Sequence, residues 1–78
     1  MNIQYSKQAL KFLKRQDKST QIRIISAINA LPAGDIIKLQ GREGYRLRIG
    51  SYRVIFNKHG KVLMIEKIDN RGQIYKGV

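Results

Sequence analysis

The segment that decides the fold is residues 38–56, KLQGREGYRLRIGSYRVIF. Two alternating runs are joined there by Gly50-Ser51, which suits a two-residue hairpin turn with positive φ at its first position. This turn fixes the pairing and places Arg48 opposite Arg53. Because strand side chains alternate with period two, the hairpin has two different faces. The apolar face carries Tyr45, Leu47, Ile49, Tyr52, Val54 and Phe56, and the other face carries Arg46, Arg48, Arg53 and Ile55.

The pairing of Arg48 with Arg53 needs a physical explanation, because directly opposed like charges destabilise a hairpin by about 0.2–1 kcal/mol. One explanation is a solvated face on which the long side chains splay apart. The other is an anion held between them. The planar guanidinium group fits phosphate oxygens and keeps its charge at any biological pH. The basic face therefore suggests a phosphate clamp.

The next strand extends this pattern. If His59-Gly60 forms the second turn, residues 62–68 pair back on the hairpin and Arg53 faces Glu66. Arg48, Arg53 and Glu66 then form one row across three strands. Glu66 is the only carboxylate predicted on this face. It is either a counter-ion that holds Arg53 or a general base that substrate binding releases.

The N-terminal half is predicted to supply a short strand and a helical hairpin. Residues 1–5 alternate weakly, and Ser6 is a plausible cap for a helix over residues 7–16. Residues 17–20 offer caps for a second helix that ends before Pro32, with its isoleucines in the core. Residues 32–41 are expected to form a loop. The predicted fold is α+β, with an antiparallel sheet of three or four strands, in a single domain over residues 1–78.

Charge dominates the composition. Sixteen Lys and Arg against five Asp and Glu give a formal net charge of +11, which implies a polyanionic partner such as nucleic acid or an acidic protein. The basic residues of the first helix are expected to be solvated and to steer such a partner at long range; they are Lys7, Lys11, Lys14 and Arg15.

There is no cysteine, and the single histidine, His59, lies in a predicted turn. We therefore expect no metal and no cofactor. The sequence also lacks an apolar run of membrane-spanning length and a signal peptide, so a cytoplasmic protein is expected.

One ordered set of motifs resembles a known family. Lys-Leu-x-Gly, Tyr-Arg-x-Arg-x-Gly-x-Tyr-Arg and Arg-x-x-x-Tyr follow one another over residues 38–75. This order resembles the RelE/ParE superfamily of bacterial toxins from type II toxin–antitoxin pairs, and it is most similar to the RelE-like mRNA interferase branch. The resemblance covers essentially the whole chain. It implies a metal-independent endoribonuclease that cuts mRNA at codons in the ribosomal A site, by attack of the 2′-hydroxyl on the scissile phosphate.

The same resemblance implies roles for individual residues. Arg46 and Arg48 occupy positions of basic residues that bind the scissile phosphate, and Arg53 matches the arginine that stabilises the transition state. Arg71 matches a basic residue that contacts the RNA. Tyr75 matches a tyrosine that stacks on a base, although a tyrosine packed at the end of the sheet is the structural alternative.

Two departures from the family leave the proton transfers open. Arg46 and Arg48 stand where relatives commonly carry lysines, and arginine is a poor proton acceptor because its pKa exceeds about 12. Asn70 stands where many relatives have a histidine. Glu66 is the alternative base.

The resemblance further implies a cognate antitoxin, acidic at the contact, together with the ribosome and mRNA as partners. It also allows operator DNA binding through the antitoxin complex, all in the bacterial cytoplasm. Two alternatives remain: a gyrase-poisoning toxin of the ParE branch, and a family member that only binds its antitoxin.

Overall fold

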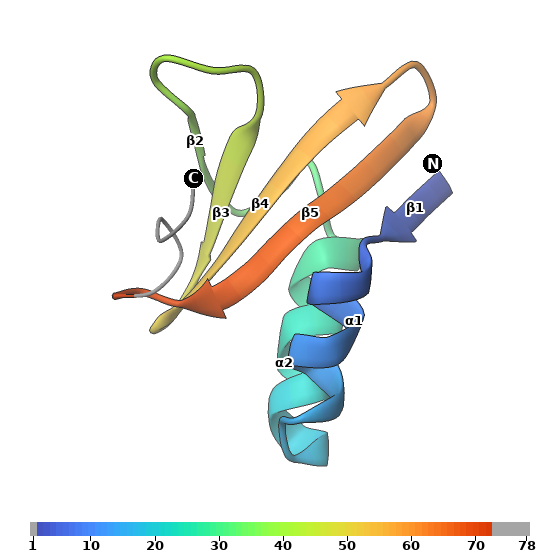
Figure 1. The fold of residues 1–78 in the computed structure, drawn as a ribbon, viewed down its shortest axis with the longest axis vertical. Helices are drawn as coiled ribbons and strands as arrows, with labels where there is room; N and C mark the ends of the chain where they lie inside the picture. The colour runs from blue at the N-terminus through green and yellow to red at the C-terminus, as the bar shows by residue number, and fades with distance from the viewer. Residues whose placement is uncertain (1, 73–78) are drawn as a thin grey trace.

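The computed structural model describes residues 2–72, which form a five-stranded sheet with two helices packed on one face (Figure 1). The strand order is β1-β5-β4-β3-β2; β1 is parallel to β5, and the other neighbours are antiparallel. This confirms the predicted α+β class, with its N-terminal strand, helical hairpin and antiparallel sheet. The elements are β1 (Asn2–Tyr5), α1 (Lys7–Lys14), α2 (Lys18–Asn29), β2 (Asp35–Lys38), β3 (Tyr45–Ile49), β4 (Tyr52–His59) and β5 (Val62–Asn70).

Both helices begin at side-chain caps, as local sequence predicted. The Ser6 hydroxyl accepts a hydrogen bond from the Ala9 N–H at 3.1 Å. The Asp17 carboxylate accepts one from the Thr20 N–H at 2.8 Å. Each bond satisfies a backbone donor that has no partner within the helix, which fixes where the helix starts.

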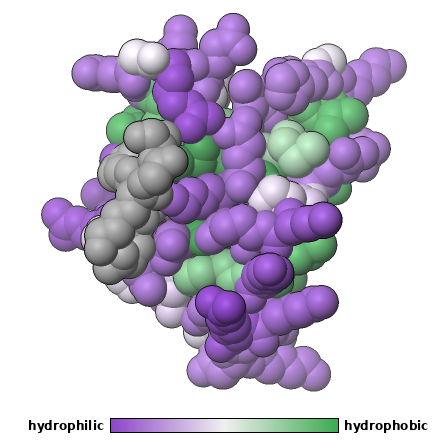
Figure 2. All heavy atoms as spheres, in the orientation of Figure 1, coloured by the Kyte–Doolittle hydropathy of each residue, from purple (hydrophilic) through white to green (hydrophobic). Residues whose placement is uncertain are grey.

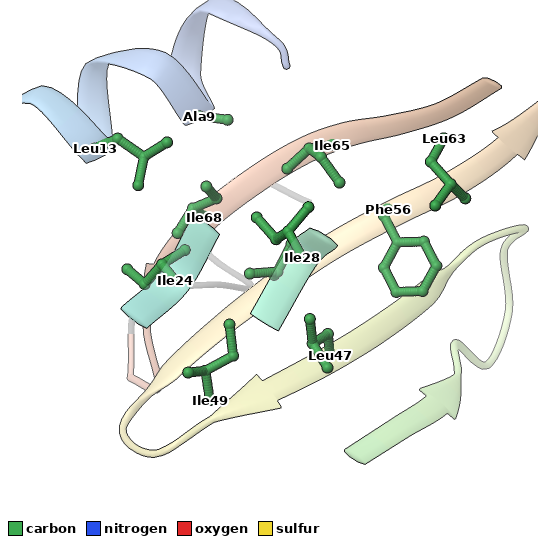
Figure 3. Packing of buried hydrophobic residues seen from close by; sticks show 11 residues of the cluster. Ala9, Leu13, Ile24, Ile28, Leu47, Ile49, Phe56, Leu63, Ile65 and Ile68 are labelled. Atoms are coloured by element: carbon green, nitrogen blue, oxygen red, sulfur yellow. The ribbon is translucent and has the colours of Figure 1, made fainter. Parts of the chain in front are cut away.

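The core forms between the helices and the apolar face of the sheet. From α1 come Ala9 and Leu13 and from α2 come Ile24 and Ile28, and these side chains point toward the strands in Figure 3. The prediction that all the isoleucines of the second helix are core was wrong, because 57% of Ile22 is exposed and Ile25 is exposed as well. At 100° per residue, a helix that buries positions 24 and 28 turns position 22 to its far side.

The β3–β4 hairpin has the predicted register. Ile49 pairs with Tyr52 and Arg48 with Arg53, and the pairing continues to Tyr45 with Phe56. Gly50 has a φ of +57° at the first turn position. Glycine adopts this conformation without the steric cost that a Cβ adds.

The predicted register of β4 with β5 was wrong. The loop is Gly60-Lys61 rather than His59-Gly60, since His59 pairs with Val62. Gly60, with a φ of +62°, occupies the first loop position, as Gly50 does in the other turn. Only glycine takes positive φ there at little cost, which explains why the turn begins one residue later.

A β-bulge shifts the same pair of strands further. Phe56 pairs with Ile65 but the preceding Ile55 pairs with Lys67, so Glu66 is an extra residue on β5. One consequence is that Arg53 faces Asp69. The predicted row of Arg48, Arg53 and Glu66 therefore does not exist.

Residues 35–38, which were expected to be part of a loop, form the edge strand β2. Asp35 pairs with Arg48 and Ile37 with Arg46. Ile36 packs against the core. Two consecutive β-branched residues favour an extended chain once a strand edge is available, and β3 provides that edge.

The first residues of α1 complete the outer edge of β5 where β1 ends. The Ser6 N–H donates to the Ile65 carbonyl at 2.9 Å, and the Ser6 hydroxyl donates to the Glu66 carbonyl at 2.8 Å. The Gln8 carboxamide then bonds to both the N–H and the C=O of Ile68, each at 2.9 Å. These bonds fix α1 to the bulged strand.

Candidate functional site

The basic face is the sheet surface opposite the helices, and its described members are Arg46, Arg48, Arg53 and Lys67. Strand pairing produces one row across four strands, namely Asp35, Arg48, Arg53 and Asp69. The carboxylate of Asp35 forms an ion pair with the Arg48 guanidinium. An aspartate at each end of the row thus offsets the repulsion between the central arginines.

Arg53 is the buried charge of this row, with 7% of the residue exposed. Its Nη1 donates to the carbonyls of Gly50 at 2.6 Å and Tyr52 at 2.9 Å. Hydrogen bonds to carbonyls reduce the cost of removing the guanidinium from water. The hairpin turn therefore holds Arg53 in a fixed position at one end of the sheet.

Arg48 is the accessible cation beside it. Its side chain is 56% exposed, and the ion pair with Asp35 lies at the solvent boundary. Exposed pairs of this kind are worth about 0–1 kcal/mol and exchange readily. Arg46 is half-buried and lies between Ile37 and Ile55 in the pairing.

Glu66 is not the cross-strand neighbour of either central arginine. Its carboxylate accepts a hydrogen bond from the Arg42 guanidinium at 2.6 Å. Arg42 belongs to the connection between β2 and β3. Glu66 is thus the counter-ion of Arg42, and the expected pairing with Arg53 was wrong.

Arg71 lies at the same end of the sheet as Arg53. Its N–H donates to the Ser51 carbonyl at 2.9 Å, which places it next to the β3–β4 turn, and the residue is exposed.

Tyr75 lies outside the described residues. The exposed His59 is in the β4–β5 hairpin, at the other end of β4. Within residues 2–72, no three His, Cys, Asp or Glu side chains are grouped so that they could hold a metal ion.

Sequence reasoning missed two carboxylates that the fold brings to the arginines, Asp35 and Asp69. It also missed the ion pair of Arg42 with Glu66. Asp35 was hidden because the sequence predicted a loop at residues 35–38. Asp69 was hidden because the second turn was placed one residue early and the bulge was not foreseen. One signal in the sequence indicated the correct second turn: Gly60-Lys61 repeats the pattern of Gly50-Ser51, with glycine at the first loop position.

An apolar pocket of about 250 Å³ lies on the helix side of the sheet. Its lining consists of Leu31, Pro32, Ile36, Lys38, Tyr45, Phe56, Lys58 and Leu63. The lining includes two cations but no carboxylate or histidine. It offers no acid–base pair, so we place the candidate site on the basic face.

These features define a small, basic α+β protein with buried and exposed arginines on one sheet face. The fold matches that of a chain in the archaeal RelE–RelB complex from Pyrococcus horikoshii OT3. The two chains are 32% identical, the match covers 92% of this chain and 96% of that chain, and the TM-score is 0.75. The RelB–RelE antitoxin–toxin complex from Methanococcus jannaschii matches with 25% identity over 94% and 95% of the chains and a TM-score of 0.77. The chain belongs to the RelE family of toxins.

A more distant match supports the fold alone. YafQ from E. coli strain BL21(DE3) shares 18% identity over 91% of this chain and 93% of that chain, with a TM-score of 0.61. No family model matches the sequence, and no curated protein does. The resemblance inferred from the motif order is therefore confirmed by three-dimensional similarity.

Proposed function

We propose that this RelE-family toxin is an endoribonuclease that cuts mRNA at codons in the ribosomal A site. The observation that carries the proposal is the basic face, where Arg46, Arg48 and Arg53 project from one hairpin, with Arg71 beside its turn. A net charge of +11 favours a polyanionic substrate. Arginine forks match phosphate oxygens in geometry as well as charge.

The reaction requires charge stabilisation and two proton transfers. Attack by the 2′-hydroxyl forms an O2′–P bond and breaks the P–O5′ bond, which leaves a 2′,3′-cyclic phosphate and a 5′-hydroxyl. The proton of the 2′-hydroxyl goes to a base, and O5′ gains a proton from an acid. Arg48 and Arg53 stabilise the extra negative charge on the phosphate, while Arg46 and Arg71 position the RNA. Tyr75 stacks on a base.

The base is a carboxylate in this proposal, because arginine is a poor proton acceptor. Glu66 is one candidate, provided that an RNA phosphate displaces it from Arg42. Asp69 is the other, because it is the cross-strand neighbour of Arg53. Substitution of each by its amide distinguishes them.

The proposed partners follow from the relatives, which were solved as complexes of RelE with the RelB antitoxin. We propose a cognate antitoxin with acidic residues against the basic face, and operator DNA binding by the toxin–antitoxin complex. The ribosome as the site of action places the toxin in the cytoplasm. Neither described helix has the length and apolar character needed to cross a membrane.

A reconstituted translation reaction followed by primer extension along the mRNA tests the proposal, with and without ribosomes. Wild-type toxin should cut at A-site codons only when ribosomes are present. Arg48→Ala removes an exposed cation, and we expect a loss of roughly 10²–10³-fold in cleavage rate if it stabilises the transition state. Lys61→Ala is the matched control, since it removes one exposed charge from the β4–β5 turn and should leave the rate unchanged.

Arg53→Ala should abolish cleavage, but the burial of Arg53 predicts a cost in stability as well. Thermal unfolding of the variant separates the two effects, and Arg53→Lys tests whether charge alone suffices. An absence of cuts in the presence of ribosomes refutes the nuclease. Induction in cells would then decide between a gyrase poison, which triggers the DNA-damage response, and a module that only binds its antitoxin.

A further inference from the structure

A polar cleft of about 360 Å³ lies between α1 and the end of β5, away from the apolar pocket. Small-ligand sites commonly have volumes of about 300–1,000 Å³. The lining consists of Gln8, Lys11, Phe12, Arg15, Gln16, Asp69 and Asn70. Asp69 pairs with Arg53 on β4. Neighbouring strands are about 4.8 Å apart, so the cleft begins one strand away from the buried arginine of the basic face.

One wall of the cleft is cationic. Lys11 lies on α1 and Arg15 is the residue that caps its C-terminus, four positions later and on the same side, and both are exposed. Within residues 2–72, neither is paired with a carboxylate. Hydrophilic residues also cover most of the molecular face seen in Figure 2, including the part formed by the helices. Two uncompensated cations at the rim of a cleft suit a phosphate group.

The other wall offers hydrogen-bonding groups of a different kind. Asp69 lies at the end of β5, where the cleft meets the basic face, and its carboxylate accepts a hydrogen bond from the Asn70 N–H at 2.8 Å. Carboxylates at nucleotide sites accept hydrogen bonds from ribose hydroxyls. The exposed Asn70 adds a carboxamide that can both donate and accept. An anion alone would be repelled by Asp69, so the cleft suits a ligand with a phosphate at one end and hydroxyl or amino donors at the other.

An aromatic side chain lies between these walls. Phe12 is half-buried, and its ring packs edge-to-face on Tyr52, with centroids 6.0 Å apart. The contact holds the ring in place and gives the cleft an apolar surface. Aromatic rings beside basic groups are the usual means by which proteins bind single-stranded nucleic acid without sequence preference.

We propose that this cleft binds one nucleotide of single-stranded RNA next to the segment on the basic face. Lys11 and Arg15 hold its phosphate, and Asp69 and Asn70 bind its ribose or base. The inference rests on the proposed function, because it gives the same RNA a second contact around the end of β5. The basic residues of α1 then bind directly instead of only steering RNA at long range.

Fluorescence anisotropy of the purified toxin with fluorescein-labelled hexauridylate tests the proposal, without ribosomes and at several salt concentrations. We expect Lys11→Ala/Arg15→Ala to weaken binding about tenfold and to reduce the salt slope by about 0.7 for each phosphate that the variant no longer neutralises. Lys7→Ala/Lys14→Ala is the matched control, since it removes the same charge from exposed positions of α1 that do not line the cleft. This control should bind within twofold of wild type.

Asp69→Asn tests the other wall. It should reduce the preference for hexauridylate over the DNA strand of the same sequence, because DNA lacks the 2′-hydroxyl that the carboxylate would accept from. Equal losses of affinity in the cleft variant and its matched control would overturn the proposal in favour of general electrostatic attraction. Unchanged RNA binding with weakened antitoxin binding would make the cleft an antitoxin contact instead.

The two proposals fail separately. The anisotropy assay measures RNA binding and no cleavage. If the wild-type toxin never cuts mRNA but Lys11→Ala/Arg15→Ala still lowers its affinity for RNA, only the nuclease is refuted. A toxin that cuts A-site codons while the cleft variant binds hexauridylate normally refutes only the cleft.

Discussion

Replacement of Gln8 by alanine should destabilise the toxin more than its surface position suggests. The Gln8 carboxamide bonds to both backbone groups of Ile68 at 2.9 Å, beyond the point where β1 stops pairing with β5. Ile68 itself is fully buried. Gln8→Ala removes both partners at once and leaves the N–H and C=O of Ile68, on the outer edge of β5, without the side chain that bonds them.

The magnitude follows from the two bonds. Each net hydrogen bond contributes about 0.5–1.5 kcal/mol to the free energy of unfolding, so the pair contributes about 1–3 kcal/mol. In a chain of 78 residues, a loss of about 2 kcal/mol lowers Tm by about 8–16 °C. Thermal and urea unfolding followed by circular dichroism measure both quantities. Gln40→Ala, at an exposed loop glutamine, is the control and should change stability by less than about 0.5 kcal/mol.

A second substitution at the same position gives a pH signature. In Gln8→Glu, the protonated acid can donate to the Ile68 carbonyl, whereas the ionised form faces that oxygen with like charge. The pKa of this carboxyl in the folded state is therefore raised above its unfolded value. Its stabilising contribution is present below the unfolded pKa and is lost as the pH rises through the folded pKa. Stability close to wild type in Gln8→Ala, or no pH dependence in Gln8→Glu relative to Gln8→Ala, would refute the reasoning.

Two further predictions concern the helices. Ile28→Ala should lower the free energy of unfolding by about 2–5 kcal/mol in urea titrations, because Ile28 is fully buried. Ile22→Ala, on the exposed side of α2, should lower it by less than about 0.5 kcal/mol. Similar losses in the two variants would contradict the packing of α2. Hydrogen bonds from the Thr20 side chain and N–H lower the pKa of Asp17, so its stabilising effect is present above the unfolded pKa and lost as the pH falls through the folded pKa. Asp17→Asn should keep the cap but flatten that acid dependence in thermal melts, and an unchanged acid limb would count against it.

The β3–β4 hairpin could be predicted completely because its determinants are local. Gly50 supplies the positive φ of the turn that fixes the register, and the alternation from Tyr45 to Phe56 puts the apolar side chains on one face. The helix caps at Ser6 and Asp17 are local in the same sense. The motif order over residues 38–75 was also sufficient to indicate the family.

The candidate site depended on non-local pairing, so the sequence by itself determined its arginines but not their neighbours. Glu66 bulges from β5. Ser6 bonds to the carbonyls of Ile65 and Glu66, and Gln8, 60 positions away from its partner in the chain, bonds to Ile68 beyond the bulge. This shift puts Asp69 rather than Glu66 beside Arg53. The strand at Asp35 likewise forms only because β3 offers it an edge. Alternation specifies which side chains share a face, whereas only the packed sheet decides which of them meet across strands, because register there depends on a turn, a bulge and an edge together.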